Sequence, residues 1–171
     1  DGSRGDEMWE RIMEAGRPHN IRPTGPSDIR RIEAGILNWG ADMTLENNVY
    51  EVGLDRLVDE DKRVSYIGCD ALKRIKTEGV KRKLVGIEIE GERIEMNATK
   101  WRAKVGGDTV GRVTSAIYSP RLKKNIGYAT VPVAYAAPGT GLRVKMSGIG
   151  ERRATVVPKP FVDPNKQIPK A

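Results

Sequence analysis

The apolar pattern changes its period near residue 83, and this change constrains the fold more than any other feature of the 171-residue chain. From Lys83 onward, apolar and charged residues alternate in short runs separated by Gly and Pro. The runs are KLVGIEIEGERI, TVGRVTSAIYS, NIGYATVPVAY, GLRVKMSG and ERRATVVPKPF. A period of two places successive side chains on opposite faces of a strand. Several short strands at this spacing indicate an antiparallel sandwich or barrel.

Helical spacing precedes this change. The segment GDEMWERIMEAG predicts an amphipathic helix, with Asp6 as its N-cap and Gly16 as its stop. A second helix is expected to begin near Ser27, whose hydroxyl can cap it. The apolar face expected to enter the core there consists of Ile29, Ile32 and Ile36.

Two further segments complete the first half. Residues 41–61 are acidic and predict a loop followed by a short strand or helix. The run YIGCDALKRIKTEG predicts a helix that stops at Gly79. We therefore expect an α+β protein: a mixed helical segment at 1–80, followed by an antiparallel β-barrel or Greek-key domain at 81–171.

The charge balance is basic, with 30 Lys and Arg against 23 Asp and Glu and a net charge of +7. This attracts anions without saying which. We expect no nucleic-acid partner, because most aromatic residues sit within apolar patterns rather than between basic ones. We expect no membrane span, because no apolar run approaches ~20 residues. Cys69 is the only cysteine and has no partner for a disulfide, which indicates a reducing, cytoplasmic setting.

Adjacent arginines in the second helix require an explanation. Neighbouring helical residues differ by about 100°, so Arg30 and Arg31 cannot share one environment. At least one guanidinium should lie at a partly desolvated surface and need a carboxylate or phosphate. That partner is either an internal acid (Asp28, Glu33 or the acidic segment 42–61) or a bound anion. The spacing alone leaves both open.

Ordered motifs resemble a known family. SDIRRIEAGILNWGADM resembles the Arg-Leu-Glu-Ala-Gly…Tyr-Gly-x-Asp pattern of the folate-dependent aminomethyltransferases, the glycine-cleavage T-protein and its relatives. The likeness continues, in order, through YEVGL, YIGCDAL, KRKLVGIEIEG, VGRVTSAIYSPRLKKNIGYATV and VVPKPF, and so covers nearly all of residues 9–161. The chain departs from the pattern at Arg30, which is usually apolar, at Trp39, often Tyr, and at Cys69, often Arg.

The resemblance implies a tetrahydrofolate site inside a three-domain clover. The family's folate-binding arginine falls on Arg31, which would clamp the glutamate of the cofactor, whereas Arg30 would be a surface feature. Trp39 would wall the folate cleft, or else would be a core residue. Phe161 matches an aromatic residue that contacts folate, although it lacks a hydroxyl for hydrogen bonding. Tyr118 is a further candidate.

The resemblance also implies what this chain lacks. The catalytic Asp and the pterin-binding Glu belong to the N-terminal part of these proteins, and neither motif occurs here. We therefore expect no catalytic residue in this chain, which would need the N-terminal portion of the same enzyme as its partner and would be inactive alone. No metal-loop pattern surrounds Asp42 and Glu46, so we expect no metal. The lone His19 lies in a polar turn, and we expect it to be exposed to solvent rather than catalytic.

Three functions compete. The strings SPRLKKNI, VVPKPFVDPNK and ENNVYEVGL most resemble the dimethylsulfoniopropionate demethylase branch, which transfers a methyl group from a small-molecule donor to tetrahydrofolate. The first alternative is the T-protein aminomethyltransferase, which needs a lipoyl carrier protein. The second is a catalytically inert folate-binding module.

Overall fold

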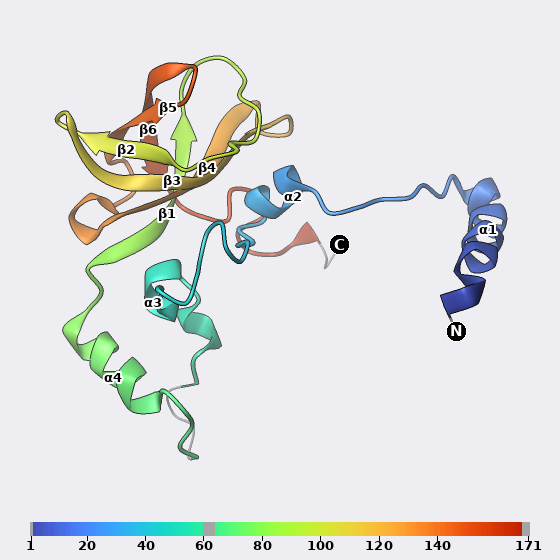
Figure 1. Ribbon diagram of the computed structural model, residues 1–171, viewed down its shortest axis with the longest axis horizontal. Coiled ribbons are helices and arrows are strands. Elements are labelled where there is room, and N and C mark those ends of the chain that lie inside the picture. The colour runs from blue at the N-terminus through green and yellow to red at the C-terminus, as the bar shows by residue number, and fades with distance from the viewer. Residues whose placement is uncertain (1, 60–63, 169–171) are drawn as a thin grey trace.

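A closed barrel of six antiparallel strands forms the main body of the protein (Figure 1). The computed structural model describes residues 2–59 and 64–168. The strands are β1 (Arg82–Ile89), β2 (Trp101–Val105), β3 (Asp108–Ser119), β4 (Lys124–Pro132), β5 (Gly141–Met146) and β6 (Gly150–Val157). They close in the order β1-β4-β3-β2-β5-β6. Hairpins join β2, β3 and β4. The long connection 90–100 leads from β1 to β2, and β4 then pairs with β1, which is a Greek-key arrangement.

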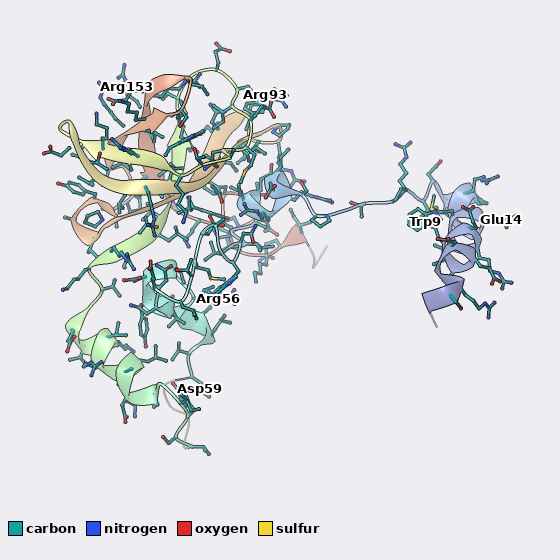
Figure 2. The ribbon with its side chains drawn as sticks, in the orientation of Figure 1. Trp9, Glu14, Arg56, Asp59, Arg93 and Arg153 are labelled. Carbon is teal, nitrogen blue, oxygen red and sulfur yellow. The ribbon has the colours of Figure 1, made fainter. Side chains whose placement is uncertain are left out.

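Within the residues that the structure describes, four α-helices precede the barrel: α1 (Gly5–Gly16), α2 (Asp28–Glu33), α3 (Val49–Val52) and α4 (Cys69–Glu78). Short 3₁₀ helices occupy Gly2–Arg4, Arg17–His19, Asp55–Leu57 and, within the barrel, Val133–Tyr135. Figure 1 shows α2 and α3 beneath the barrel, near the segment that follows β6. In the same view α1 stands apart at the end of an extended segment, and Trp9 on α1 is labelled far from the barrel in Figure 2.

Two apolar clusters hold the structure together. The first fills the barrel with inward-facing aliphatic side chains and Trp101, as the period-2 pattern requires. The second lies outside the barrel, where Leu84, Ile126 and Tyr128 of β1 and β4 meet Ile32 of α2 and Val52 of α3. Burial of the second cluster fixes α2 and α3 against the barrel wall. These short helices are therefore stabilised by packing rather than by their own length.

The expected α+β class with a C-terminal antiparallel barrel is confirmed, and so is the helix that ends before Gly79. The division at residues 80 and 81 stays a prediction, with β1 beginning at Arg82. Within the described ranges, no helix is both long enough and apolar enough to cross a membrane.

Two local expectations were wrong, and one strand was missed. The cap of α1 is Arg4, and Asp6 lies inside the first turn. Ile36 is 58% exposed because α2 ends at Glu33 and the chain turns at Gly35, whose φ is +73°. Strand β2, beginning at Trp101, was not expected.

Candidate functional site

Helix α2 is fixed at both ends by polar contacts. At its start, Ser27 Oγ accepts a hydrogen bond from the Arg30 amide at 3.3 Å, which confirms the predicted cap. At its end, the Tyr128 hydroxyl from β4 lies 3.0 Å from the Ile32 carbonyl oxygen, to which it donates. Burial, reinforced by the negative charge of Asp42, raises the pKa of Tyr128. The hydroxyl thus stays a donor and holds the helix to the barrel.

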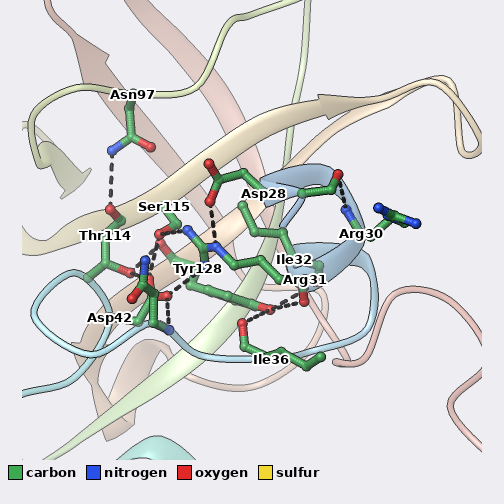
Figure 3. A network of polar contacts seen from close by, with 12 residues as sticks. Asp28, Arg30, Arg31, Ile32, Ile36, Asp42, Asn97, Thr114, Ser115 and Tyr128 are labelled. Atoms are coloured by element: carbon green, nitrogen blue, oxygen red, sulfur yellow. Dashed lines mark hydrogen bonds and ion pairs between the residues drawn. The ribbon is translucent and has the colours of Figure 1, made fainter. Parts of the chain in front are cut away.

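Arg31 is the centre of a polar network that Figure 3 shows at close range. Its Nε donates to Asp28 Oδ1 at 2.6 Å, and its two terminal nitrogens donate to Asp42 Oδ2 at 2.9 Å and Ser115 Oγ at 3.1 Å. The Arg31 side chain is 14% exposed and the Asp42 side chain 0%, whereas Asp28 is 49% exposed. One guanidinium therefore makes both a surface ion pair and a buried one.

The Asp42 carboxylate is fully engaged. Besides Arg31, it accepts hydrogen bonds from the Asn38 amide at 2.9 Å, the Thr114 hydroxyl at 2.7 Å and the Ser115 hydroxyl at 2.6 Å. A buried carboxylate is tolerated when it is paired and its oxygens receive several donors. The network therefore joins the 27–42 segment to strand β3.

A β-bulge makes this junction possible. The pairing of β3 with β4 shifts between Val113 and Ser115, so Thr114 is an extra residue without a partner in the register. In a regular strand, Thr114 and Ser115 would point to opposite faces. A bulge re-aims one of them, and both hydroxyls reach the same carboxylate oxygen of Asp42.

The ion-pair interpretation of Arg31 is confirmed for Asp28 and for Asp42 of the acidic segment. It is wrong for Glu33. That side chain is buried and accepts a 2.5 Å hydrogen bond from the Ser119 hydroxyl, with no ion pair to any residue in the described part of the chain. Glu33 also anchors the C-terminal segment, because its carbonyl oxygen accepts from the amides of Phe161 and Val162, each at 3.0 Å.

A cavity of about 440 Å³ lies beside Arg31, and Asp28, Leu37 and Asn38 contribute to its wall. The three hydrogen bonds of the guanidinium use three of its five N–H donors, so two remain for a ligand. However, Arg31 with Asp28 and Asp42 carries a formal charge of −1, which disfavours a further carboxylate. The role of Arg31 as a folate clamp stays a prediction.

The other predicted cofactor residues do not converge on this cavity. Trp39 is 61% exposed. Phe161 packs on the Tyr128 ring with centroids 6.1 Å apart, within the second apolar cluster. Tyr118 lies under the Arg93 guanidinium, which is 5.5 Å from its ring centroid. Arg31 alone among the four predicted residues lines either of the two cavities described.

A larger cavity, of about 860 Å³, lies between α2, the α3 region and the segment after β6. We call it the basic cavity. Its wall contains five cationic residues: Arg30, Arg56, Arg121, Lys159 and Lys166. Sequence reasoning did not find this group, because its members come from segments far apart in the chain and no short motif unites them.

Lys159 is the most enclosed cation of the basic cavity. Its Nζ donates to the Val52 carbonyl oxygen at 2.8 Å and lies 5.9 Å from the Tyr128 ring centroid. Burial lowers the pKa of Lys159, and the nearby carboxylates of Asp42 and Asp55 oppose that effect. The protein supplies one hydrogen-bond acceptor to this ammonium group, which has further N–H donors for a bound anion.

Comparisons with known proteins agree with this architecture. The family described as the glycine cleavage T-protein C-terminal barrel domain matches residues 82–163, and the GCVT N-terminal domain matches residues 1–62. An aminomethyltransferase of Symbiobacterium thermophilum is 40% identical over 90% of this chain and 41% of its own length. One from Alkaliphilus oremlandii is 37% identical over 94% of this chain and 43% of its own.

A solved structure shows the same fold. The glycine cleavage system aminomethyltransferase T from Bartonella henselae matches with a TM-score of 0.71 and 24% identity, over 79% of this chain and 37% of that one. The chain thus spans about two-fifths of the length of the relatives it matches. On the combined match of both domain families, the chain belongs to the glycine cleavage T-protein family.

Proposed function

We propose that the protein to which this chain belongs is a tetrahydrofolate-dependent aminomethyltransferase. It would move the one-carbon unit of an aminomethyl group, carried on the lipoyl arm of a carrier protein, to tetrahydrofolate, and the amine would leave as ammonia. The observation that carries this proposal is the 40% identity, over 90% of the chain, to a protein named aminomethyltransferase. The relatives favour this alternative over the dimethylsulfoniopropionate demethylase interpretation, which belongs to the same family.

Within that enzyme, this chain would supply one wall of the folate site, and the rest of the protein would supply the catalytic carboxylate. Arg31 and Trp39 are the proposed cofactor contacts from the α2 region. Phe161 packs on Tyr128, whose hydroxyl donates to the Ile32 carbonyl oxygen of α2, and so helps to position this helix. The N-terminal portion of the enzyme and the lipoyl carrier protein are the proposed partners. A cytoplasmic location suits a chain whose single cysteine is not in a disulfide.

The test is an assay of the full-length protein with tetrahydrofolate and two alternative donors. Ammonia release from an aminomethyl-loaded lipoyl carrier protein is the expected result. Formation of 5-methyltetrahydrofolate from dimethylsulfoniopropionate, with no ammonia from the carrier, would contradict the aminomethyltransferase assignment and restore the demethylase interpretation.

An inert folate-binding module is the remaining alternative, and a binding measurement separates it. If full-length protein binds tetrahydrofolate but turns over neither donor, the inert module is correct. Arg31→Ala tests the proposed clamp: we expect weaker binding of tetrahydrofolate, but not of tetrahydropteroate, which lacks the glutamate. Equal losses for both ligands would show that Arg31 acts through the fold alone.

A further inference from the structure

One outer face of the barrel carries a concentration of positive charge. Alternate side chains of β2, β3, β5 and β6 point away from the interior, which holds Ala103, Val113, Val144 and Ala154. The strand register places six outward cations in two rows across these strands. We call this surface the basic barrel face, and its cations are Arg102, Lys104, Arg112, Arg143, Lys145 and Arg153.

Like charges lie directly opposite one another in the first row. Arg102 of β2 pairs in register with Arg112 of β3 on one side and with Lys145 of β5 on the other. Opposed side chains in an antiparallel pair have Cβ atoms about 4.5–5.5 Å apart, so these cations repel one another. None of the three makes an ion pair within residues 2–59 and 64–168, and Arg112 Nε is buried without a hydrogen-bond partner there.

The second row is compensated only in part. Lys104 pairs in register with Arg143, and Arg143 with Arg153. The carboxylate of Glu151 serves two of these cations, at 2.8 Å from Lys104 Nζ and 3.7 Å from Arg143. Arg153 lies 3.6 Å from Glu90, and these two side chains are 75% and 65% exposed. In the described part of the chain, two carboxylates thus pair with six cations, a formal excess of four out of the net charge of +7.

The basic barrel face lies away from both cavities. Figure 1 shows β2, β5 and β6 in the upper part of the barrel, whereas α2 and α3 lie beneath it, and Figure 2 labels Arg153 in that upper part. The six cations line neither of the two cavities described. A molecule bound to this face therefore leaves the proposed folate site open.

The composition of the basic barrel face indicates what it can bind. The two rows, all of whose residues the structure describes, contain no aromatic or large apolar side chain, so neither base stacking nor insertion into a lipid layer is available. Four of the six cations are arginines, whose planar guanidinium groups bind carboxylates through two parallel hydrogen bonds. Charge complementarity of this kind gives fast, salt-sensitive association.

We propose that the basic barrel face is a docking surface for a second protein, whose complementary surface is acidic. Carboxylates of this partner pair with the two rows of cations and relieve the repulsion within them. The partner holds the protein in an assembly and takes no part in its chemistry, because both cavities stay free. The inference goes beyond the proposed function, since no residue of the proposed folate site belongs to this face.

Binding of fluorescently labelled poly-L-aspartate to the full-length protein tests the proposal by anisotropy. The double variant Arg102→Gln/Lys145→Gln removes two exposed cations from the first row. We expect it to bind the peptide about tenfold more weakly at low salt, which is about 1.4 kcal/mol. The difference should shrink as salt concentration rises. The double variant should be at least as stable in urea as the unchanged protein, because it relieves repulsion; a lower stability would contradict the argument.

A matched control removes two cations from the basic cavity. Arg56 and Arg121 are exposed, line that cavity and lie outside the basic barrel face. The variant Arg56→Gln/Arg121→Gln changes the net charge equally and should keep the full affinity for poly-L-aspartate. Equal losses in both double variants would show a general charge effect, and a loss in the control alone would place the peptide in the cavity. Either result overturns the proposal.

Two other occupants of the face would give different results. Nucleic acid would show binding of a DNA duplex that Arg102→Gln/Lys145→Gln weakens, with no binding of poly-L-aspartate. The lipoyl carrier protein would show a KM that rises in the same double variant, whereas we expect turnover with the carrier to be unchanged. Each of these results would overturn the proposal of a separate acidic partner, and so would the failure of poly-L-aspartate to bind even at low salt.

Discussion

Replacing Asp42 by Asn tests whether the buried ion pair holds the α2 segment to the barrel. Asn keeps the shape of the side chain, and the hydroxyls of Thr114 and Ser115 can rotate to accept hydrogen bonds from its amide. What is lost is the negative charge 2.9 Å from the Arg31 terminal nitrogen, at a side chain that is 0% exposed. Breaking a buried pair in this way costs about 3–5 kcal/mol, because the remaining charge stays desolvated.

We expect Asp42→Asn to lower the free energy of unfolding by about 3 kcal/mol, at the low end of that range, since Arg31 retains Asp28. The matched control is Asp28→Asn, which removes the other carboxylate from the same guanidinium. Asp28 is 49% exposed, so its pair with Arg31 should contribute only about 0–1 kcal/mol. Urea denaturation of the full-length protein, followed by far-ultraviolet circular dichroism, gives both values.

Equal losses for the two substitutions would refute the reasoning, because exposure would then not decide the strength of the pair. A loss below about 1 kcal/mol for Asp42→Asn would also refute it. Salt supplies an independent check. Added salt should weaken the small contribution of the exposed Asp28 pair and leave that of Asp42 nearly unchanged.

Four other substitutions, one of them a control, give measurable expectations by urea denaturation. Tyr128→Phe should cost about 0.5–1.5 kcal/mol, because the hydroxyl bond to the Ile32 carbonyl oxygen at 3.0 Å is lost while that oxygen keeps the Gly35 amide at 3.1 Å, and an unchanged stability would contradict the anchoring role. Gly127→Ala should cost about 1–3 kcal/mol or more, since a Cβ there would lie 2.3 Å from a carbonyl oxygen of β3, whereas Gly141→Ala, with open space, should cost under about 1 kcal/mol. Burial lowers the pKa of Lys159 below 10.5, so the unfolded chain binds this proton more tightly than the folded one. The free energy of unfolding of the unchanged protein, relative to that of Lys159→Met, should therefore rise as pH rises from the lowered pKa toward 10.5. A difference that does not change with pH would contradict this.

The barrel was predictable because its strands alternate. Five of the six strands were expected from period-2 runs, since the inside of a closed barrel admits only apolar side chains at alternate positions. Strand β2 was missed although Trp101, Ala103 and Val105 alternate with Arg102 and Lys104. It is short and basic, and only the Gly pair that follows it marks a hairpin.

The polar network was not predictable in the same way. Asp42 lies in an acidic segment that local composition assigns to solvent, and its burial depends on contact with the hydroxyls of β3 some 70 residues later. The bulge at Thr114 has no signature in the sequence, because Val-Thr-Ser-Ala fits a regular strand equally well. The cap at Ser27 was predictable because it depends on residues three positions apart.

The two arginines of α2 bind different partners, and helix geometry accounts for the difference. A step of about 100° directs Arg31 toward Asp42 and Ser115 and Arg30 away from them (Figure 3). The charge of Arg31 is compensated by two carboxylates, whereas the partners of Arg30 are neutral. Of the two, only Arg30 lines the basic cavity and adds to its positive charge. Arg31→Ala should therefore lower the free energy of unfolding more than Arg30→Ala does, because only Arg31 takes part in a buried ion pair. Equal losses for the two substitutions, measured by urea denaturation, would show that adjacent positions on this helix do not differ in their contribution to stability.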